Sequence, residues 1–391
     1  MNWLSWRRGI KLFYNTEPTE LNRKGHASML EQVCKMIEES GNRPSGEEIF
    51  SLDGYLASIK ERKLALYGAG GVGYATSAIL IDKGCKPSCF IDDDKTKQGM
   101  LVNGMKVLSF PDIERIEEYE ILICVPNFQN IYNKLKDLGV GNVRYFPVAA
   151  VEKGYYDVSL IKDNWNSIVR TYDLLSDGFS RLVFCNILKH RLTMDFSYLN
   201  GSMALKQYFP YDLFTHGGNE CFVDGGAYNG ETIADFINAV HNNYQSIYAF
   251  EPDRQNFQQL KNNTRHIARL HLLNAGLYSE TREIGFSSLG NSGSFISETG
   301  KDRISLVKLD DMAAELKPTY IKLDIEGAEK EALHGMKNII TACHPKLAVS
   351  IYHKASDLWE LPLLIHSLNP AFNIHIRHYS LDLNETVCYA T

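Results

Sequence analysis

The stretch CFVDGGAYNG, residues 221–230, has the pattern of a buried strand that ends in a glycine turn and continues into a helix. Glycines at such a turn allow a ligand to approach the backbone, because no side chain stands in the way. The free amides at the start of the helix that follows can bind a carboxylate or a phosphate. The stretch therefore predicts an α/β sheet with a ligand site at the carboxyl edge of this strand.

The next strand-like run, SIYAFEPD, ends in Glu251. An acidic side chain at that position can accept hydrogen bonds from both hydroxyls of a ribose. A dinucleotide and S-adenosylmethionine both contain that ribose, but the glycines are spaced GGxxxG rather than GxGxxG. Asp224, just before the glycines, offers a partner for an amino-acid group, which only S-adenosylmethionine carries. We therefore predict S-adenosylmethionine as the cofactor.

Seven strand-like runs follow residue 219, and most are separated by helix-like stretches. They are CFVDG, SIYAFE, HLLNA, YIKLDI, LAVSIYH, FNIHIRHY and ETVCYA. The last two have no helix-length segment between them, so they are expected to pair as an antiparallel hairpin. Seven strands that end in such a hairpin are the layout of a class I methyltransferase. Because residues 63–148 show a similar strand–helix rhythm, the predicted fold is α/β with two Rossmann-like domains.

From about residue 205 to 391 the sequence resembles the FkbM family of S-adenosylmethionine-dependent methyltransferases. The stretches that carry the resemblance are FVDGGAYNGETI, YAFEPDRQNFQQL, LDDM, TYIKLDIEGAEKEALHGM, PKLAVSIYHKASDLWELP and RHYSLDLNETVCYA. The resemblance implies transfer of a methyl group, usually to a hydroxyl of a sugar or another natural product. The predicted cofactor-binding residues are Asp224, Gly225, Gly226, Ala227, Gly230, Glu251 and, beside the adenine, Asn274.

Ionisable side chains follow three of the predicted strands and are expected to face one cleft. They are Asp324, Glu326, His353 and His378. A hydroxyl is a weak nucleophile unless its proton is withdrawn, and histidine titrates near neutral pH. We predict His353 as the general base, with Asp324 orienting it or the acceptor. His378 is the second histidine of the predicted catalytic group, although a packing role is favoured for it alone.

Two further roles at this cleft are left open. Lys322 is included in the predicted catalytic group, where it keeps Asp324 ionised, binds an acceptor phosphate or forms a structural ion pair. A divalent metal held by Asp324, Glu326 and one histidine is a minority alternative, because the sequence offers only two obvious oxygen ligands.

The Gly- and Ser-rich segment 285–303 is interpreted as a lid or as an ordinary flexible connection.

A second glycine turn, LALYGAGGVG at residues 64–73, matches GxGxxG. The residues of this predicted second nucleotide site are Gly68, Gly70, Gly73 and Asp92. The stretch FIDDDKTKQGMLVNGMKVLS, residues 90–109, resembles the small nucleotide-binding domains at the front of sugar-modifying enzymes, which favours binding of a nucleotide-linked or phosphorylated acceptor. An NAD(P) site is the second interpretation, and a dimerisation fold without ligand is the third.

Composition narrows the class of protein further. The 391 residues carry a net charge of −6, with 44% hydrophobic and 23% charged residues, which is typical of a globular protein and argues against a nucleic acid as partner. No apolar run approaches the length of a membrane span, and the eight scattered cysteines lack a CxxC pair. We therefore expect a cytoplasmic protein with reduced thiols that acts on a small-molecule or glycoconjugate acceptor; homo-oligomerisation is left open.

The chain is expected to divide into four parts. These are a helical region 1–60, a nucleotide-binding domain 61–150, a helical linker 151–215 and a methyltransferase domain 216–391. The predicted function is O-methylation of a sugar, nucleotide-sugar or other glycoconjugate or natural-product precursor, which places the protein in polysaccharide biosynthesis. The alternatives are a nucleotide-sugar oxidoreductase that uses the Gly68–Gly73 turn and a scaffold that binds nucleotides without turnover.

Overall fold

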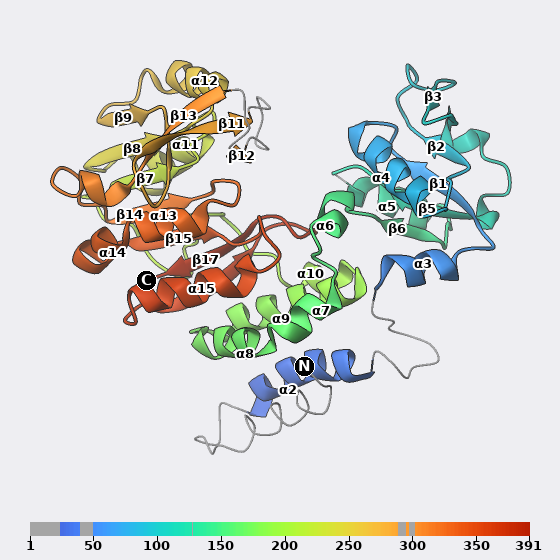
Figure 1. The fold of residues 1–391 in the computed structure, drawn as a ribbon, viewed down its shortest axis with the longest axis horizontal. Coiled ribbons are helices and arrows are strands. Elements are labelled where there is room, and N and C mark those ends of the chain that lie inside the picture. The colour runs from blue at the N-terminus through green and yellow to red at the C-terminus, as the bar shows by residue number, and fades with distance from the viewer. Residues whose placement is uncertain (1–23, 40–49, 127, 288–294, 297–301) are drawn as a thin grey trace.

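The computed structural model describes residues 24–39, 50–126, 128–287, 295–296 and 302–391. Figure 1 shows an N-terminal sheet and a larger C-terminal sheet that lie apart, with a layer of helices below them. The mixed α/β class expected from the sequence is confirmed. Of the predicted helical region 1–60, the part before residue 24 and the segment 40–49 lie outside the described residues, and the rest contains α2 (Lys24–Glu39) and α3 (Leu52–Ser58).

The N-terminal sheet has six strands in the order β3-β4-β2-β1-β5-β6. All neighbouring strands pair in parallel except β3 and β4. The strands are β1 (Lys63–Tyr67), β2 (Cys89–Ile91), β3 (Leu101–Val102), β4 (Met105–Leu108), β5 (Tyr119–Ile123) and β6 (Val143–Tyr145). The helices that connect them are α4 (Gly71–Asp82) and α5 (Phe128–Asp137), together with the short turns η1 (Phe110–Asp112) and η2 (Ile116–Glu118). The expected strands are present; β3 and β4 are additional, because their hairpin is too short to give a strand pattern.

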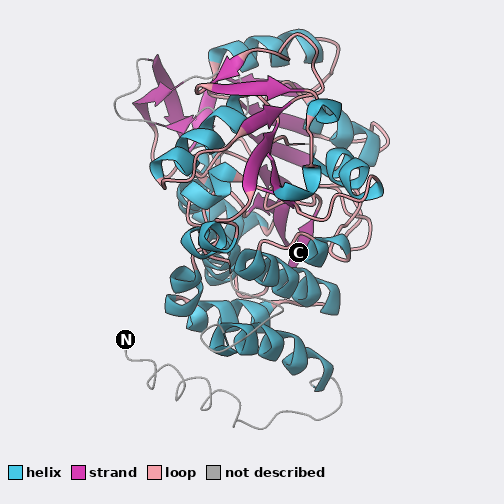
Figure 2. Ribbon diagram, turned by 90° about the vertical axis from the view of Figure 1, so that its right-hand side faces the viewer, coloured by secondary structure: helices cyan, strands magenta, loops and turns pink. Residues whose placement is uncertain are grey.

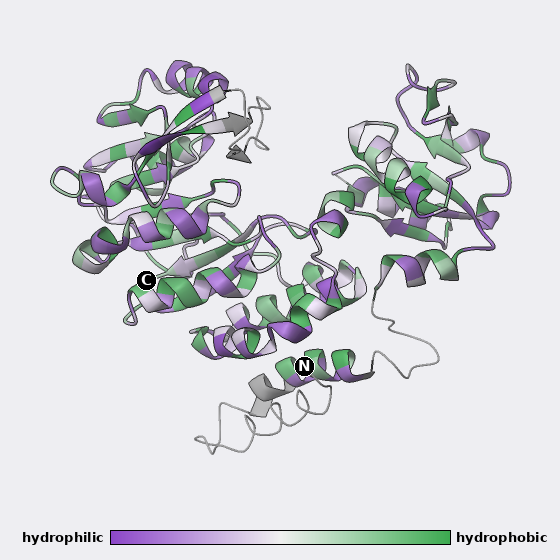
Figure 3. Ribbon diagram, viewed as in Figure 1, coloured by the Kyte–Doolittle hydropathy of each residue, from purple (hydrophilic) through white to green (hydrophobic). Residues whose placement is uncertain are grey.

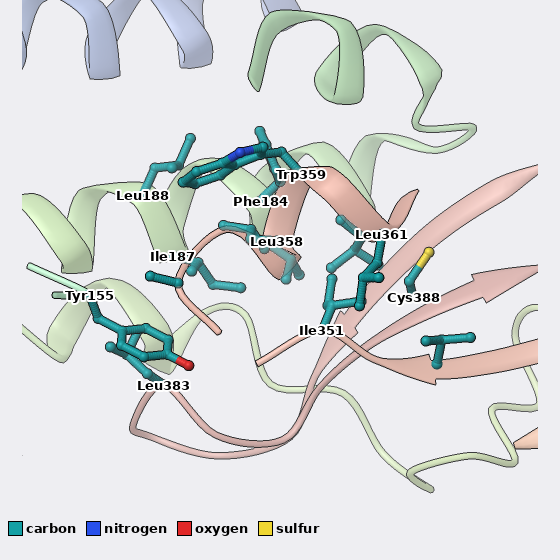
Figure 4. Packing of buried hydrophobic residues seen from close by; sticks show 14 of the residues in the cluster. Tyr155, Phe184, Ile187, Leu188, Ile351, Leu358, Trp359, Leu361, Leu383 and Cys388 are labelled. Carbon is teal, nitrogen blue, oxygen red and sulfur yellow. The ribbon is translucent and has the colours of Figure 1, made fainter. Parts of the chain in front are cut away.

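A layer of helices joins this sheet to the C-terminal half. It consists of α6 (Val148–Glu152), α7 (Val158–Asp163), α8 (Trp165–Leu174), α9 (Gly178–Thr193) and α10 (Ser197–Asn200). Figure 4 shows Phe184, Ile187 and Leu188 of α9 facing Leu358 and Trp359. The last two belong to α15 (Asp357–Leu368), which covers one face of the C-terminal sheet. The helical layer therefore shares a hydrophobic core with the C-terminal half.

Polar contacts reinforce this packing at the loop between β15 (Lys346–Ser350) and α15. The hydroxyl of Tyr155, which follows α6, donates to the carbonyl of Tyr352. The buried guanidinium of Arg191 in α9 donates to the carbonyl of Ala355 at 2.6 Å. The loop that carries His353 is thus held from outside the C-terminal sheet.

The C-terminal sheet has seven strands in the order β16-β17-β15-β14-β7-β8-β9. β16 and β17 pair antiparallel, and β17 also pairs antiparallel with β15, while the other strands are parallel. The strands not yet bounded are β7 (Cys221–Gly225), β8 (Ser246–Phe250), β9 (Leu270–Leu273), β14 (Tyr320–Leu323), β16 (Ile374–His378) and β17 (Thr386–Ala390). This order confirms the predicted seven strands and the terminal hairpin. Figure 2 shows helices on both sides of the sheet.

The helices of this half follow the parallel strands. They are α11 (Glu231–Ala239), α12 (Arg254–Thr264), α13 (Glu329–Gly335) and α14 (Lys337–Cys343), with η3 (Leu309–Met312) before β14. Figure 3 shows hydrophobic stretches running through the strands of both large sheets. Among the described residues, no helix combines the length and apolar character required to cross a membrane.

A four-stranded sheet, β10-β13-β11-β12, was not anticipated. Its strands are β10 (Ala275–Leu277), β11 (Arg282–Ser287), β12 (Phe295–Ile296) and β13 (Asp302–Val307). The predicted lid or flexible connection at 285–303 overlaps three of them. The ends of that segment are strand, while 288–294 and 297–301 lie outside the described residues. The alternation of Ile284 with Phe286 and of Ile304 with Leu306 extends over only two apolar positions in each strand, which explains why the sequence did not indicate this sheet.

Candidate active site

A cavity of about 290 Å³ opens at the carboxyl edge of β7, β8 and β14. Its wall combines the glycine turn after β7, the ends of β8 and β14, and the small sheet β10–β13. The lining residues are Gln207, Tyr208, Gly226, Ala227, Tyr228, Asn229, Glu231, Thr232, Glu251, Pro252, Asn256, Gly276, Leu277, Ile304, Leu306, Lys322, Asp324, Ile325, Glu326, Ala328 and Glu385. The position is the one at which open α/β sheets bind ligands.

The turn after β7 requires glycine at Gly226. Its φ of +76° is in the left-handed region, and a Cβ atom there would lie 1.9 Å from the carbonyl oxygen of Asp324. Gly230 also has a positive φ, +95°, and forms the N-cap of α11. The turn after β7 and the end of β14 are thus in backbone contact, and the amides of Gly226 and Ala227 donate to the carbonyl of Phe250 at the end of β8, so the turn is fixed against both neighbouring strands.

Glu251 lies at the end of β8 and is 5% exposed. One carboxylate oxygen accepts from the amide of Tyr228 and the other from the amide of Asp253, both at 2.9 Å. Each oxygen keeps a second lone pair for a ligand. Burial raises the pKa of Glu251 to about 7, against the opposing effect of the two amide donors. Asn274 does not line the cavity; its amide donates to the carbonyls of Glu251 and Pro252.

Asp224 and Lys322 form a buried ion pair behind the turn. They are register partners on the parallel strands β7 and β14, so both side chains point to the same face. The Lys322 ammonium lies 3.0 Å from Asp224 Oδ1 and donates to the carbonyls of Gly225 and Gly226. Asp224 is fully buried, and burial raises its pKa although Lys322 opposes the shift. Asp224 therefore supports the turn from below, whereas the sequence assigned it a direct contact with the cofactor.

Asp324 is the centre of a polar group at the other end of the cavity. Its two carboxylate oxygens accept from the hydroxyls of Tyr208 at 2.9 Å and Tyr352 at 3.1 Å. Partial burial by itself would raise the pKa of Asp324, but Lys322 and His353 lower it below its usual value. Asp324 is therefore ionised at neutral pH and faces the cavity.

His353 lies behind this wall rather than in it, with 6% of its side chain exposed. Its Nδ1 is 2.9 Å from Glu329 Oε1, and its Nε2 is 3.4 Å from Asp324 Oδ1 and 3.6 Å from Glu326 Oε2. Burial lowers the pKa of His353, but the three carboxylates outweigh it and raise the pKa to about 9. Burial raises the pKa of Glu326 to about 7.

The other predicted histidine is not part of this group. His378 is fully buried in β16, its Nδ1 lies 2.8 Å from the hydroxyl of Thr386, and burial lowers its pKa to about 4. It does not line the cavity. The structure therefore brings together His353, Asp324, Glu326 and Lys322 and places His378 elsewhere.

Several residues of the site were missed by sequence reasoning. They are Gln207, Tyr208, Glu329, Tyr352 and Glu385. The amide of Gln207 donates to the carboxylate of Glu385 across the cavity wall. Tyr208 adopts a φ of +63° in a segment without regular structure. Only Tyr352 had a signal, because it adjoins His353.

The first glycine turn has the three glycine roles of a GxGxxG motif. Gly68 has a φ of +115°, a Cβ on Gly73 would lie 1.9 Å from the carbonyl oxygen of Gly68, and a Cβ on Gly70 would meet open space. Asp92 is nevertheless already engaged: it accepts from the amide of Ala69 at 2.8 Å and pairs with Lys97 at 3.0 Å. The predicted nucleotide or NAD(P) site stays a prediction.

Comparison with known proteins adds three findings. Residues 224–379 match the family model of the methyltransferase FkbM domain. The crystal structure of methyltransferase FkbM from Methylobacillus flagellatus is similar over 94% of this chain and 100% of that chain, with 23% sequence identity and a TM-score of 0.76. No curated protein sequence matches the chain significantly.

Two shorter structural matches were also found. Fibrillarin from Aeropyrum pernix in complex with S-adenosyl-L-methionine has 10% identity and a TM-score of 0.30, over 44% of this chain and 66% of that chain. UDP-D-quinovosamine 4-dehydrogenase from Vibrio fischeri has 26% identity and a TM-score of 0.21, over 24% of this chain and 85% of that chain.

Proposed function

The segment 224–379 is an FkbM methyltransferase domain, and from this premise we propose that the protein transfers a methyl group from S-adenosylmethionine to a hydroxyl of a sugar or a sugar-containing precursor. The observation that carries the proposal is the cavity between the Gly226 turn and Glu251. The family supports the methyl transfer, while the cofactor and the acceptor are the proposed part.

The residues around the turn fit S-adenosylmethionine. Glu251 keeps lone pairs for two ribose hydroxyls, and Gly226 lines the cavity without a Cβ, so a ligand can approach the backbone of the turn. Leu277, Ile304 and Leu306 supply an apolar wall for a base. The carboxylates that line the rest of the cavity suit a ligand that carries positive charge. The bound cofactor supplies a methyl group on a sulfonium centre, which needs no further activation.

The acceptor is proposed to occupy the end of the cavity formed by Asp324, Glu326 and Glu385. Carboxylates accept hydrogen bonds from hydroxyl groups and repel phosphates, so the reacting end of the acceptor carries hydroxyls rather than a phosphate. Orientation of the hydroxyl and exclusion of water are the main contributions that such a site makes. The hydroxyl proton passes to this acidic wall as the oxygen is methylated.

The geometry leads us to revise the predicted general base. The Asp324 and Glu326 carboxylates line the cavity, whereas His353 stands behind them. We propose that the carboxylates meet the acceptor and that His353 fixes their positions. His378 and Asp224 are not retained as direct contacts, and Asn274 holds the backbone at the end of β8.

Calorimetric titration of the ligand-free protein with S-adenosylmethionine tests the proposed cofactor. We expect saturable binding that Glu251→Ala weakens about tenfold to a hundredfold, because hydrogen bonds to a charged group contribute about 1.5–3 kcal/mol. Asp92→Ala, the corresponding change at the first glycine turn, is the matched control and should bind normally. Binding of a nicotinamide dinucleotide in place of S-adenosylmethionine would overturn the proposal.

The affinity for S-adenosylmethionine should also depend on pH. Burial raises the pKa of Glu251 to about 7 in the free protein, and only the ionised carboxylate can accept from both ribose hydroxyls. Affinity is therefore retained above this pKa and falls as the pH drops through it, to about a tenth one unit below. Calorimetry about one unit below and about two units above the pKa measures the change, and Glu251→Gln should show a flat profile. Equal wild-type affinities at both pH values would contradict the role of the carboxylate.

A further inference from the structure

The imidazole of His353 lies among more carboxylates than it can pair with. Ligand atoms of Asp324, Glu329 and His353 lie within 4.8 Å of one another, and Glu326 Oε2 is 3.6 Å from His353 Nε2. Glu329 is 1% exposed, whereas Glu326 is 40% exposed and faces the cavity. Three carboxylates around one imidazole leave a net negative charge even when the ring is protonated. Such a group attracts a cation.

The orientation of the imidazole is that of a metal ligand. Nδ1 lies 2.9 Å from Glu329 Oε1, an ion-pair contact that restrains the ring and leaves the other nitrogen for a metal. That other nitrogen, Nε2, is buried, and neither ring nitrogen forms a hydrogen bond of good geometry. A cation that binds Nε2 displaces the proton carried there by the charged ring. It points instead between Asp324 and Glu326.

The distances fit two ligands of one ion better than hydrogen bonds. The separations of 3.4 Å and 3.6 Å from Nε2 to the two carboxylate oxygens exceed the usual hydrogen-bond range of about 2.7–3.2 Å. Two atoms that each lie about 2.1 Å from one cation, at an angle of about 90–110°, are about 3.0–3.4 Å apart. A small movement of the exposed Glu326 side chain would complete the set.

We propose that a divalent cation binds at this wall, held by Asp324, Glu326 and Nε2 of His353, with Glu329 orienting the imidazole. One imidazole with carboxylate oxygens suits a first-row ion such as Mn²⁺ better than Ca²⁺, which prefers oxygen ligands alone. The sequence offered this site only as a minority alternative, because it showed only two obvious oxygen ligands; the structure adds that His353 is the histidine beside them.

The site deepens the proposed function and rests on it for its role. Asp324 and Glu326 line the cavity, so an ion between them would face the hydroxyl to be methylated. A cation polarises a bound hydroxyl and stabilises the negative charge that develops on its oxygen. The proton released from the hydroxyl then leaves to solvent or to a neighbouring carboxylate, and no redox change is required.

Titration with Mn²⁺ alone tests the site without any acceptor. The protein is stripped with a chelator, and free Mn²⁺ is measured by its electron paramagnetic resonance signal. We expect one saturable site, weakened at least about tenfold in Asp324→Asn, Glu326→Gln and His353→Gln. The partly exposed Glu326 allows substitution with little effect on folding, which thermal unfolding in the chelator verifies. Absence of saturable binding, or an affinity in all three variants equal to that of the wild type, would overturn the proposal.

His375→Gln is the matched control. His375 also pairs with a carboxylate, since its Nδ1 lies 2.6 Å from Asp177 Oδ2, but it lies on β16 outside the cavity lining. This variant should bind Mn²⁺ as the wild type does. Repeating the S-adenosylmethionine titration in the chelator separates the two proposals. Cofactor binding without Mn²⁺ binding overturns the cation site alone, and Mn²⁺ binding without cofactor binding overturns the proposed function alone.

Discussion

Gly226→Ala is expected to reduce the affinity for S-adenosylmethionine by at least about a hundredfold, which corresponds to about 2.7 kcal/mol. The added Cβ would lie 1.9 Å from the carbonyl oxygen of Asp324, and the φ of +76° is unfavourable for alanine. Backbone atoms cannot yield as a flexible side chain can, so the turn and the end of β14 must separate. The turn and the Asp324 carboxylate then no longer lie at the separation that the cavity requires to hold the cofactor.

Gly84→Ala is the control for backbone conformation. Gly84 has a φ of +75°, almost the same as Gly226, but a Cβ there would meet open space. It should show only the conformational cost of about 1 kcal/mol and bind the cofactor normally. Calorimetry and thermal unfolding of both variants separate the effect of the steric clash at Gly226 from the effect of the unfavourable φ, which both positions share. If Gly226→Ala bound S-adenosylmethionine within a few-fold of the wild type, the turn would not form part of the cofactor site.

Lys322→Met should destabilise the fold by about 3–5 kcal/mol, because it leaves a buried carboxylate without its partner. Lys322 is 1% exposed and Asp224 is fully buried, and the ammonium also binds two carbonyls of the turn. The double variant Asp224→Asn/Lys322→Met should recover part of the loss, since the unpaired charge is removed. Denaturant unfolding measures the free energy of each variant.

An exposed ion pair serves as the control for Lys322→Met. Lys330 and Glu360 lie 2.9 Å apart with side chains 50% and 40% exposed. Lys330→Met should change the free energy of unfolding by less than about 1 kcal/mol. A loss of that small size in Lys322→Met would show that Asp224 is neutral or solvated in the folded protein. The assignment of Asp224 and Lys322 as a buried ion pair would then be wrong.

Strand prediction succeeded wherever an apolar run ended at a turn. The seven strands from β7 to β17 in the large C-terminal sheet and the parallel strands of the N-terminal sheet have this pattern, because both faces of a covered parallel sheet are apolar. The small sheet β10–β13 was missed, since its strands are short and two of them, β10 and β13, contribute residues to the cavity wall. Antiparallel pairing of β11 with β13 arises from tertiary contact that no local pattern indicates.

The cofactor turn and the acidic wall could be predicted from the sequence, because the carboxyl ends of parallel strands all lie at the same edge of the sheet. Glu251, Asp324 and Glu326 lie there for that reason. Sequence could not show that Asp224 points below the turn, since that depends on its register with Lys322. Nor could it predict Tyr208, whose contact with Asp324 comes from a segment without periodicity.

The loop held by Tyr155 and Arg191 has a consequence for dividing the protein into smaller pieces. A polypeptide starting at residue 216 would contain every strand of the large sheet but would lack both donors to the carbonyls of Tyr352 and Ala355. It would also leave Trp359, now fully buried, without the helix that covers it. A fragment intended for expression should therefore begin before α6, so that it includes the helices that contact the His353 loop.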